Sequence, residues 1–496
     1  MNQAQWRRQH KWSGIISCFF LLMFSVSGII LNHRQAVSDI DISRSLLPGR
    51  YSYSKWNGGL LRGSVRYVTD HATPSVLVYG NSGIWLTDST GRSFADFNRG
   101  LPAGADNRQV RGLVQTADST LFAATLFDLY RYDAQSGKWL RVSLPKPDDE
   151  KLTDVATDGK TLVVAGRSNL YVSAPPFKSF RKVQVAAPAE DVGKVTLFRT
   201  IWSLHSGALF GLPGRIFVDI IGVIFIFLSI TGIICWLVPK HIRRKVLKGA
   251  KAIRSVRVTV FSSRWHRRIG AATIVLTMAV VITGWCLRPP VLVLLALNKV
   301  PTLPGTTLHS DNPWNDKLRM VRFDESRGDW LLSTSEGFYA LSSPDGMPVK
   351  QQQTPPVSVM GLNVMQPDGQ GRWLCGSFSG MYVWDREHGI SLDYFTGEPV
   401  REVSGPPFGK RAVSGYSRDF GQVPVVVEYH GGTDALEQPD ELSHLPMSLW
   451  ALALEIHNGR IYFGPIATYV FVFLAGLIFF WCLLSGWKMR KPRTRQ

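Results

Sequence analysis

Cysteine is scarce in this chain, and its placement excludes a disulfide framework. Five cysteines occur in 496 residues. Four of them fall one each into four apolar runs, so Cys375 stands alone outside those runs and no intradomain disulfide is available there. The other four lack CxxC spacing, which favours small apolar fillers over metal ligands. They are Cys18, Cys235, Cys286 and Cys482.

Acidic residues are missing from three basic segments, and this absence predicts the topology. The N-terminal tail, the segment 240–268 and the C-terminal tail hold the whole excess of Lys and Arg, +19, without one Asp or Glu. Because Lys and Arg collect on the cytoplasmic side of membrane spans, we expect all three segments in the cytoplasm. Anionic lipid headgroups are sufficient partners for this charge, so nucleic-acid binding is not expected.

The four apolar runs predict four membrane-spanning helices, since each is near the roughly 20 residues that cross about 30 Å of hydrocarbon. The first run exceeds the roughly 7–15 apolar residues of a signal peptide, so we interpret it as a span. We expect a multi-pass protein of the bacterial inner membrane with both termini in the cytoplasm. The predicted division is a cytoplasmic tail (1–11), a first span (12–31), a periplasmic β segment (32–200), an outer approach helix with the second span (201–238), a basic cytoplasmic loop (239–268), a third span (269–288), a second periplasmic β segment (289–450), an outer approach helix with the fourth span (451–487), and a cytoplasmic tail (488–496).

The membrane part is an internal duplication. Spans one and three align without a gap, and the approaches to spans two and four share LHSG and IHNG. Spans two and four also both close on a small residue followed by glycine. Each unit enters and leaves the cytoplasm, so the two repeats are parallel, and their glycines suit close helix packing in lipid. The matched positions are His10 with His266, Gly28 with Gly284, His205 with His457, and Thr231-Gly232 with Ser485-Gly486.

The two outside segments are expected to be all-β. Five phrases, each a short apolar strand, a Gly or polar turn and a second strand, recur at roughly 40–50 residues, a period typical of β-propeller blades. We predict three blades in the first segment and two or three in the second, closing one propeller of about six blades. Two separate β-domains are the alternative, and no WD40 or kelch consensus is present. The phrases are SVLVYGNSGIWLTDS, TLFAATLFDLYRYDA, TLVVAGRSNLYVSAP, DWLLSTSEGFYALSS and RWLCGSFSGMYVWDR.

Four histidines are candidate haem ligands. His10 and His266 lie at the cytoplasmic ends of their spans, and His205 and His457 lie at the outer approaches. Neutral imidazole is a common axial ligand of haem iron, and facing helices of a bundle can supply two. For each single histidine, an ordinary polar residue at the membrane interface is the alternative interpretation. Recurrence at matched repeat positions favours two bis-histidine sites, one at each membrane face.

Three further residues are candidates near these sites. His33 adds an imidazole at the outer end of the first span. Asp219 lies within the second span, where a carboxylate is costly; it is either functional or a partner of Arg215, one turn earlier. Arg460 follows His457 closely and its charge suits a haem propionate.

The strings QHKWSGI, SGIILNH, LHSGALFGLPG, IHNGRIYFG and LLSGWK resemble the PepSY-associated transmembrane family, which includes ferrisiderophore reductases of bacterial inner membranes. The resemblance covers about 150 residues in the four spans and their flanks. It implies b-type haem between helices, a ligand role for His10, His205, His266 and His457, with His33 as a further candidate, and electrons delivered outward to a ferric chelate. Family members often carry PepSY modules outside the membrane, whereas this chain has propeller-like phrases, so the acceptor stays open.

The leading hypothesis is transmembrane electron transfer through two b-type haems, with His10 and His266 on the cytoplasmic side and His205 and His457 outside. The protein would then be a ferric-chelate reductase in iron uptake, acting on a periplasmic chelate or protein partner; no catalytic residue is assigned. No dinucleotide GxGxxG context occurs in the short cytoplasmic segments, so a quinol or a separate cytoplasmic reductase would donate the electrons. The alternatives are a non-enzymatic propeller module for binding or sensing, which needs no cofactor, and a metal-chelate transporter.

Overall fold

A computed structural model describes residues 2–67, 75–188, 193–358, 360–400, 409, 411–421 and 423–489. The chain divides into two compact units. The membrane unit comprises Met1–Val37, Val192–His309 and Leu449–Gln496, and the β unit comprises Ser38–Asp191 and Ser310–Ser448. Each unit is thus assembled from separate stretches of the chain.

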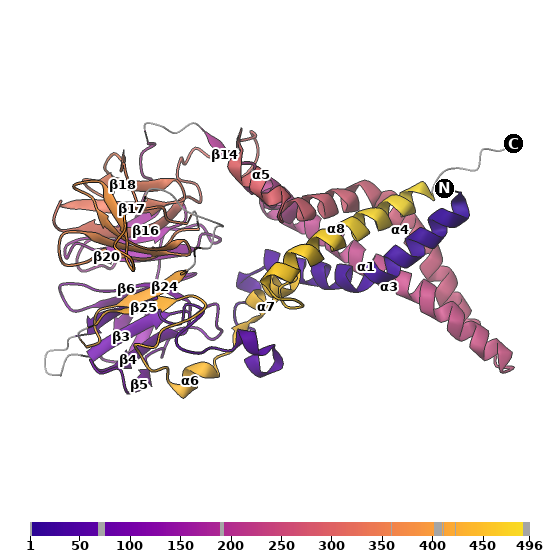
Figure 1. The fold of residues 1–496 in the computed structure, drawn as a ribbon, viewed down its shortest axis with the longest axis horizontal. Coiled ribbons are helices and arrows are strands. Elements are labelled where there is room, and N and C mark those ends of the chain that lie inside the picture. The colour runs from indigo at the N-terminus through magenta and orange to yellow at the C-terminus, as the bar shows by residue number, and fades with distance from the viewer. Residues whose placement is uncertain are drawn as a thin grey trace. The chain divides into compact units, whose positions relative to one another are not determined.

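Helices make up nearly all of the membrane unit (Figure 1). Its four long helices are α1 (Gln3–Asn32), α3 (Gly211–Leu247), α4 (Ile253–Cys286) and α8 (Pro465–Lys488). Shorter helices are α2 (Leu197–Ser206), α5 (Val291–Leu297) and α7 (Leu449–His457), and a small sheet pairs β14 (Lys194–Thr196) with β15 (Lys299–Pro301). Among the residues that the structure describes, four segments are long and apolar enough to cross a membrane, namely Gln3–Asn32, Ala208–Leu247, Ile253–Cys286 and Ala467–Lys488. The chain is therefore a multi-pass membrane protein, as predicted.

The long helices pack as a four-membered ring. Helix α1 contacts α3 and α8, and α4 contacts the same two helices, so α1 and α4 lie diagonally opposite. Small residues allow close approach: the backbone of Gly222 in α3 faces Ile29, and Gly476 in α8 faces the indole of Trp285. Such contacts suit packing in lipid, where apolar burial does not drive helices together.

The basic segment 239–268 differs from the expected loop, because helix extends into it from both sides. Helix α3 runs on to Leu247 and α4 begins at Ile253, so only a short connection separates them. Gly249 adopts φ +71° in this connection, a conformation that side-chain-bearing residues rarely take. Lys and Arg are good helix formers, and a segment so rich in them favours helix up to that glycine.

The described part of the β unit contains small antiparallel sheets. The first segment supplies β2 (Gly63–Tyr67), β3 (Ser75–Gly80), β4 (Gly83–Thr87) and β5 (Phe94–Asp96); β6 (Val110–Gln115), β7 (Leu121–Thr125), β8 (Leu129–Asp133) and β9 (Lys138–Val142); and β10 (Leu152–Thr157), β11 (Leu162–Gly166), β12 (Leu170–Ser173) and β13 (Arg181–Val183). The second supplies β16 (Leu318–Asp324), β17 (Asp329–Thr334), β18 (Gly337–Leu341) and β19 (Val349–Lys350); β20 (Leu362–Pro367), β21 (Trp373–Ser377), β22 (Gly380–Asp385) and β23 (Ile390–Asp393); and the pair β24 (Val413–Ser417) with β25 (Val425–Glu428). Strands β1 (Asp41–Ile42) and β26 (Met447–Ser448) pair across the unit's two ends, and α6 (Asp440–Ser443) is a single turn.

Each recurring phrase forms the second and third strands of a four-stranded sheet. SVLVYGNSGIWLTDS, for example, contains β3 and β4, which pair in antiparallel register with Val78 opposite Trp85. The middle strands are the most buried, as in β7 and β11, where every residue is buried. The first strands of the sheets contact one another in succession: β2 with β6, β6 with β10, β10 with β16, β16 with β20, β20 with β24, and β24 with β2.

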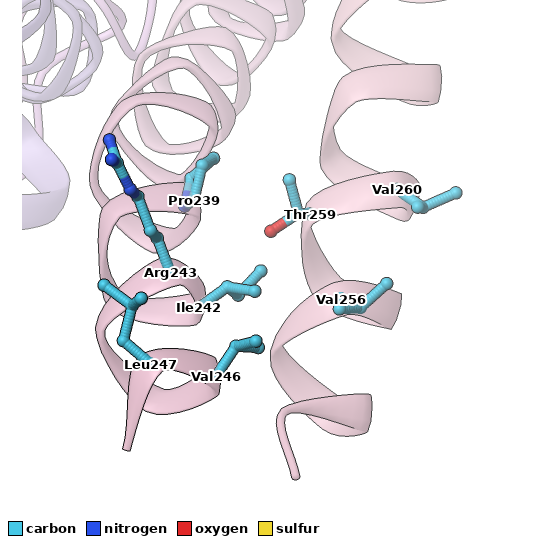
Figure 2. A pocket seen from close by; sticks show the side chains of 8 residues that line it. All are labelled: Pro239, Ile242, Arg243, Val246, Leu247, Val256, Thr259 and Val260. Atoms are coloured by element: carbon cyan, nitrogen blue, oxygen red, sulfur yellow. The ribbon is translucent and has the colours of Figure 1, made fainter. Parts of the chain in front are cut away.

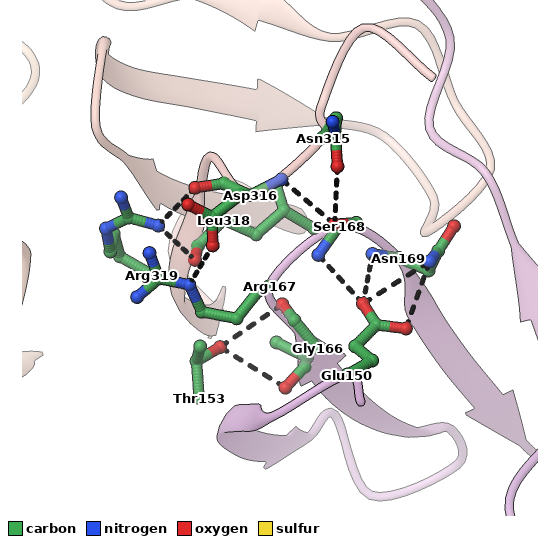
Figure 3. A network of polar contacts seen from close by, with 11 residues as sticks. Glu150, Thr153, Gly166, Arg167, Ser168, Asn169, Asn315, Asp316, Leu318 and Arg319 are labelled. Atoms are coloured by element: carbon green, nitrogen blue, oxygen red, sulfur yellow. Dashed lines mark hydrogen bonds and ion pairs between the residues drawn. The ribbon is translucent and has the colours of Figure 1, made fainter. Parts of the chain in front are cut away.

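The two outside segments join within this one unit through polar seams (Figure 3). Arg167, from the first segment, forms an ion pair with Asp316 of the second at 2.5 Å between Nε and Oδ1, and Leu318 donates its backbone N–H to the Arg167 carbonyl. Beside them, Glu150 accepts hydrogen bonds from the backbone N–H groups of Ser168 and Asn169. Apolar side chains of both segments also pack together behind this seam, in a cluster that includes Val163, Leu170, Val321 and Trp330. The β unit is therefore built from both outside segments.

Candidate functional site

The first histidine pair joins the two diagonal helices. His10 of α1 and His266 of α4 face each other with ring centroids 6.1 Å apart and ring planes at 64°. These histidines are 256 positions apart in the sequence, and the packing of α1 and α4 at opposite corners of the ring lets their side chains meet. Sequence reasoning predicted this pairing.

Each ring of the first pair is held through its Nδ1 atom by a neighbouring helix. His10 Nδ1 lies 2.9 Å from the Cys482 carbonyl of α8 and 3.5 Å from the Ser485 hydroxyl. His266 Nδ1 lies 3.0 Å from the Thr231 hydroxyl of α3. We call each such hydroxyl and the glycine that follows it a histidine seat.

The second histidine pair repeats this design on short helices. His205 lies in the last turn of α2 and His457 is the last residue of α7, and their ring centroids lie 6.2 Å apart with planes at 49°. His205 Nδ1 lies 3.1 Å from the Thr283 hydroxyl of α4. His457 Nδ1 lies 3.1 Å from the Ser27 hydroxyl of α1 and 2.9 Å from the carbonyl of Phe24.

The seats determine which ring nitrogen carries the proton. The Thr231 hydroxyl donates to the Phe227 carbonyl at 2.7 Å, and the Thr283 hydroxyl donates to the Ala279 carbonyl at 2.8 Å. Ser27 and Ser485 use their hydroxyl protons on carbonyls of their own helices in the same way. A hydroxyl that has already donated its proton can only accept, so each imidazole donates from Nδ1. The lone pair of Nε2 is then left for a metal, as the outer contacts of metal-binding histidines commonly arrange.

The spacing of both pairs fits one metal atom between two imidazoles. A metal–nitrogen bond is about 2.1 Å and a ring centre lies roughly 1.1 Å beyond the nitrogen, which places two in-line ring centroids about 6.4 Å apart. Both observed separations are close to this value. Within the described part of the chain, no three His, Cys, Asp or Glu side chains gather to hold a bare metal ion. A two-histidine site therefore suits a metal that brings its other ligands, as haem iron does.

The glycine of each seat leaves room for the ring. A Cβ built on Gly284 would lie 2.7 Å from Cε1 of His205, and one on Gly486 would lie 3.1 Å from Cε1 of His10. At Gly28 the distance to His457 Cε1 is 3.2 Å, and at Gly232 the distance to His266 Cε1 is 3.5 Å. The two-residue motif of hydroxyl and glycine thus has a local role, which the sequence alone suggested only as helix packing.

Every histidine is seated by the opposite repeat. His10 and His205 belong to the first repeat and contact α8 and α4 of the second, whereas His266 and His457 belong to the second and contact α3 and α1 of the first. In α1 the ligand His10 precedes the seat residue Ser27 by 17 positions, which is about 26 Å along a helix, and α4 has the same spacing between His266 and Thr283. The two sites thus lie toward opposite ends of the bundle.

The remaining candidates lie beside the second pair or near the end of α1. His33 Nε2 lies 2.7 Å from Asp219 Oδ2, and Asn32 donates to Asp219 Oδ1 at 2.9 Å. Asp219 therefore pairs with His33, a partnership that no sequence signal indicated. Arg460 bonds through Nε to both carboxylate oxygens of Glu455, at 3.1 and 3.0 Å.

One residue near the second pair was missed by sequence reasoning. Arg288 follows the end of α4, and its charge acts on His457 and on Arg460. An arginine just after the third span looks ordinary in the sequence, because Arg residues commonly end spans. The position of α7 brings its charge to the histidine.

Comparisons with known proteins give one family match and several distant structural matches. Similar solved structures include the extracellular domains of the B. thetaiotaomicron proteins BT4673 and BT3049, at 11% and 9% identity with TM-scores of 0.37 and 0.34. The matches cover 78% and 77% of this chain but only 34% and 40% of those proteins, so the chain spans well under half of their length. Among curated proteins, none matches the sequence. Residues 1–239 of this membrane protein match the family model of the PepSY-associated TM region, in agreement with the resemblance seen in the sequence.

Proposed function

We propose that the protein binds two b-type haems, one between His10 and His266 and one between His205 and His457, and carries electrons across the membrane. The observation that carries this proposal is the matched geometry of two histidine pairs, with ring centroids 6.1 and 6.2 Å apart and every Nδ1 engaged by a seat. Haem supplies a one-electron iron couple when bound. The chain's own residues orient the imidazoles, keep them neutral and surround them with apolar helices.

The distribution of charge supports an orientation for this path. The excess of Lys and Arg lies in both tails and in the segment 240–268, so we place these in the cytoplasm of a bacterium and the protein in its inner membrane. The first histidine pair then lies on the cytoplasmic side and the second on the periplasmic side. Electrons entering at the first site leave at the second.

For the β unit we propose one six-bladed propeller made from both outside segments. The closed succession of first-strand contacts, from β2 through β24 and back to β2, supports a ring of six sheets. Such a ring would offer the periplasmic surface on which an acceptor or partner protein docks.

The acceptor that fits best is a ferric siderophore or other ferric chelate, since the family resemblance includes ferrisiderophore reductases. One electron would convert the chelated ferric ion to ferrous iron, which chelators of hard ferric ions hold less tightly. The protein would then act as a ferric-chelate reductase in iron uptake. A quinol or a cytoplasmic reductase would supply the electron.

Absorption spectroscopy of the detergent-purified protein tests the proposal. We expect a dithionite-reduced minus oxidised spectrum of b-type haem, with two haems per chain. His266→Ala and His205→Ala should each remove the part of this absorption that comes from one haem. His388→Ala is the matched control, because this exposed histidine lies in the β unit beside Asp385.

A colourless wild-type protein from haem-sufficient cells would refute two-haem electron transfer. If one of these variants gives the same spectrum as the wild type, the histidine that was replaced is not a haem ligand. Reduction of a ferric chelate by protein in sealed vesicles, with donor on the cytoplasmic face only, tests the direction of transfer.

A further inference from the structure

An apolar groove lies between the α3 and α4 arms of the basic hairpin (Figure 2). Its volume is about 370 Å³. Three of the apolar residues that line it are strongly exposed, with Leu247 at 77%, Val260 at 63% and Val246 at 61%. Arg243 lies at its edge in Figure 2. Side chains of this kind favour a partner that removes them from water.

Helix length argues against lipid as the cover for the whole groove. The predicted second span ends at Val238, and Leu247 lies nine residues further along α3, about 13 Å at 1.5 Å per residue. The headgroup layer adds only about 5–8 Å on each side of the hydrocarbon. With α3 running along the membrane normal, the far half of the groove would lie beyond the headgroups, in the aqueous phase.

The charge around the groove specifies the chemistry of a partner. The segment 239–268 carries eleven Lys and Arg and no acidic residue. Arg243 lines the groove, and Arg254 lines a second hollow between the same arms, together with His241. An apolar floor inside a basic rim complements a protein surface with an apolar patch inside an acidic rim.

The groove also adjoins the first histidine site. Helix α4 is continuous from Ile253 to Cys286, and Val260 precedes His266 by six residues, about 9 Å along the helix. A protein seated in the groove therefore rests on the helix that carries one ligand of the first pair. This position is where an electron donor has to approach.

We propose that the α3–α4 hairpin docks a soluble one-electron carrier protein with an acidic surface, of the flavin or iron–sulfur class. This inference rests on the proposed function and names its donor. In each transfer the reduced carrier loses one electron, the first site gains it, and no bond is formed or broken. The basic rim steers the carrier, and the apolar groove holds it near the site.

Direct binding to the full-length protein tests this docking independently of haem. The protein is placed in nanodiscs of phosphatidylcholine, which carries no net charge, and binding of a purified acidic flavodoxin and a purified acidic ferredoxin is measured by biolayer interferometry. We expect saturable binding of at least one carrier that weakens at least tenfold in about 0.5 M salt, since exposed charges are then screened. Arg243→Glu with Arg254→Glu, and separately Val246→Ser with Val260→Ser, should each weaken it at least tenfold. Lys160→Glu with Arg327→Glu is the control, with the same change of charge in the β unit.

The outcomes separate the docking from the haem proposal. Wild-type protein that binds neither carrier, or groove variants that bind as tightly as wild type, would show that the docking proposal is wrong. Hairpin-dependent uptake of phosphatidylglycerol from mixed vesicles, without carrier binding, would assign the groove to anionic lipid and likewise overturn it. Carrier binding by a protein that gives no haem spectrum with dithionite would refute the haem proposal and leave the docking intact.

Discussion

The membrane unit and the β unit hold their buried polar side chains by different means. In the membrane unit the four ligand imidazoles make neutral hydrogen bonds to carbonyls and hydroxyls of adjoining helices. In the β unit full charges are buried in pairs. Arg386, whose side chain is 2% exposed, lies between Asp324 and Asp329, and Arg322 lies against the buried Asp154.

This difference follows from the environments of the two units and from the roles of the buried side chains. A charge within lipid is costly and a neutral imidazole is not, so a membrane ligand is best held by neutral bonds that leave Nε2 available. Arg386 instead links strands of two sheets through its ion pairs with Asp324 and Asp329. The membrane unit leaves Nε2 of each ligand histidine available for a metal, whereas the β unit neutralises its buried charges in ion pairs.

Breaking the Arg386 network should have the largest effect. Arg386→Met leaves Asp324 and Asp329 without their cation, and removing one partner of a buried ion pair costs about 3–5 kcal/mol. Denaturant unfolding followed by tryptophan fluorescence measures the loss. Arg181→Met is the control, because its pair with Asp345 is more than half exposed and worth about 1 kcal/mol or less. Equal losses in the two variants would contradict the comparison.

Filling a histidine seat should come next. Gly284→Ala places a methyl group 2.7 Å from the His205 ring, so the imidazole has to move, and we expect roughly a tenfold loss of haem affinity at the second site. Gly232→Ala, with 3.5 Å to the His266 ring, should keep its haem. Haem content per chain, from the pyridine haemochrome assay, distinguishes them. Equal haem content in both variants would argue against the seats.

Acid should weaken the β unit through Asp324. Burial alone would raise the pKa of this carboxyl, but hydrogen bonds from Ser326 and Trp373 and the charge of Arg386 outweigh it and place the pKa below the ordinary 3.8. A lowered pKa contributes stability above the unfolded value that is lost as the pH falls through the folded value. The stability difference between wild type and Asp324→Asn should therefore narrow from pH 5 toward pH 3 in urea unfolding. A constant difference would exclude this contribution.

The smallest effect concerns the second histidine site. A nearby cation favours the reduced form of a redox centre, so the charge of Arg288, which acts on His457, should raise the potential of the second site. Arg288→Gln should lower that potential by on the order of tens of millivolts. Spectroelectrochemical titration measures both midpoints, and the first should stay unchanged. A shift of the first midpoint alone would contradict this placement.

Local patterns predicted much of both units, and contacts between distant segments supplied what they could not. Hydropathy located four spans, and the recurring phrases located the paired middle strands of five sheets. The repeat alignment paired His10 with His266. It could not show that Thr283 contacts His205. The pattern within one helix does not show which helices are its neighbours in the bundle. The His33–Asp219 pair, 186 positions apart, was missed for the same reason. The helical arms at 239–268 were missed because the Lys and Arg residues there were used to predict topology, and their helix propensity was not considered.

The crossed seating of the histidines bears on how such a protein could arise. A single helix–domain–helix unit holds two ligands and two seats, but none of its ligands meets its own seats. Two identical copies related by a two-fold axis along the bundle would complete both sites, each with the same histidine contributed twice. Fusion of two such copies then allows each half to change separately. At the matched repeat positions of Ser27 with Thr283, and of Thr231 with Ser485, the two halves already differ.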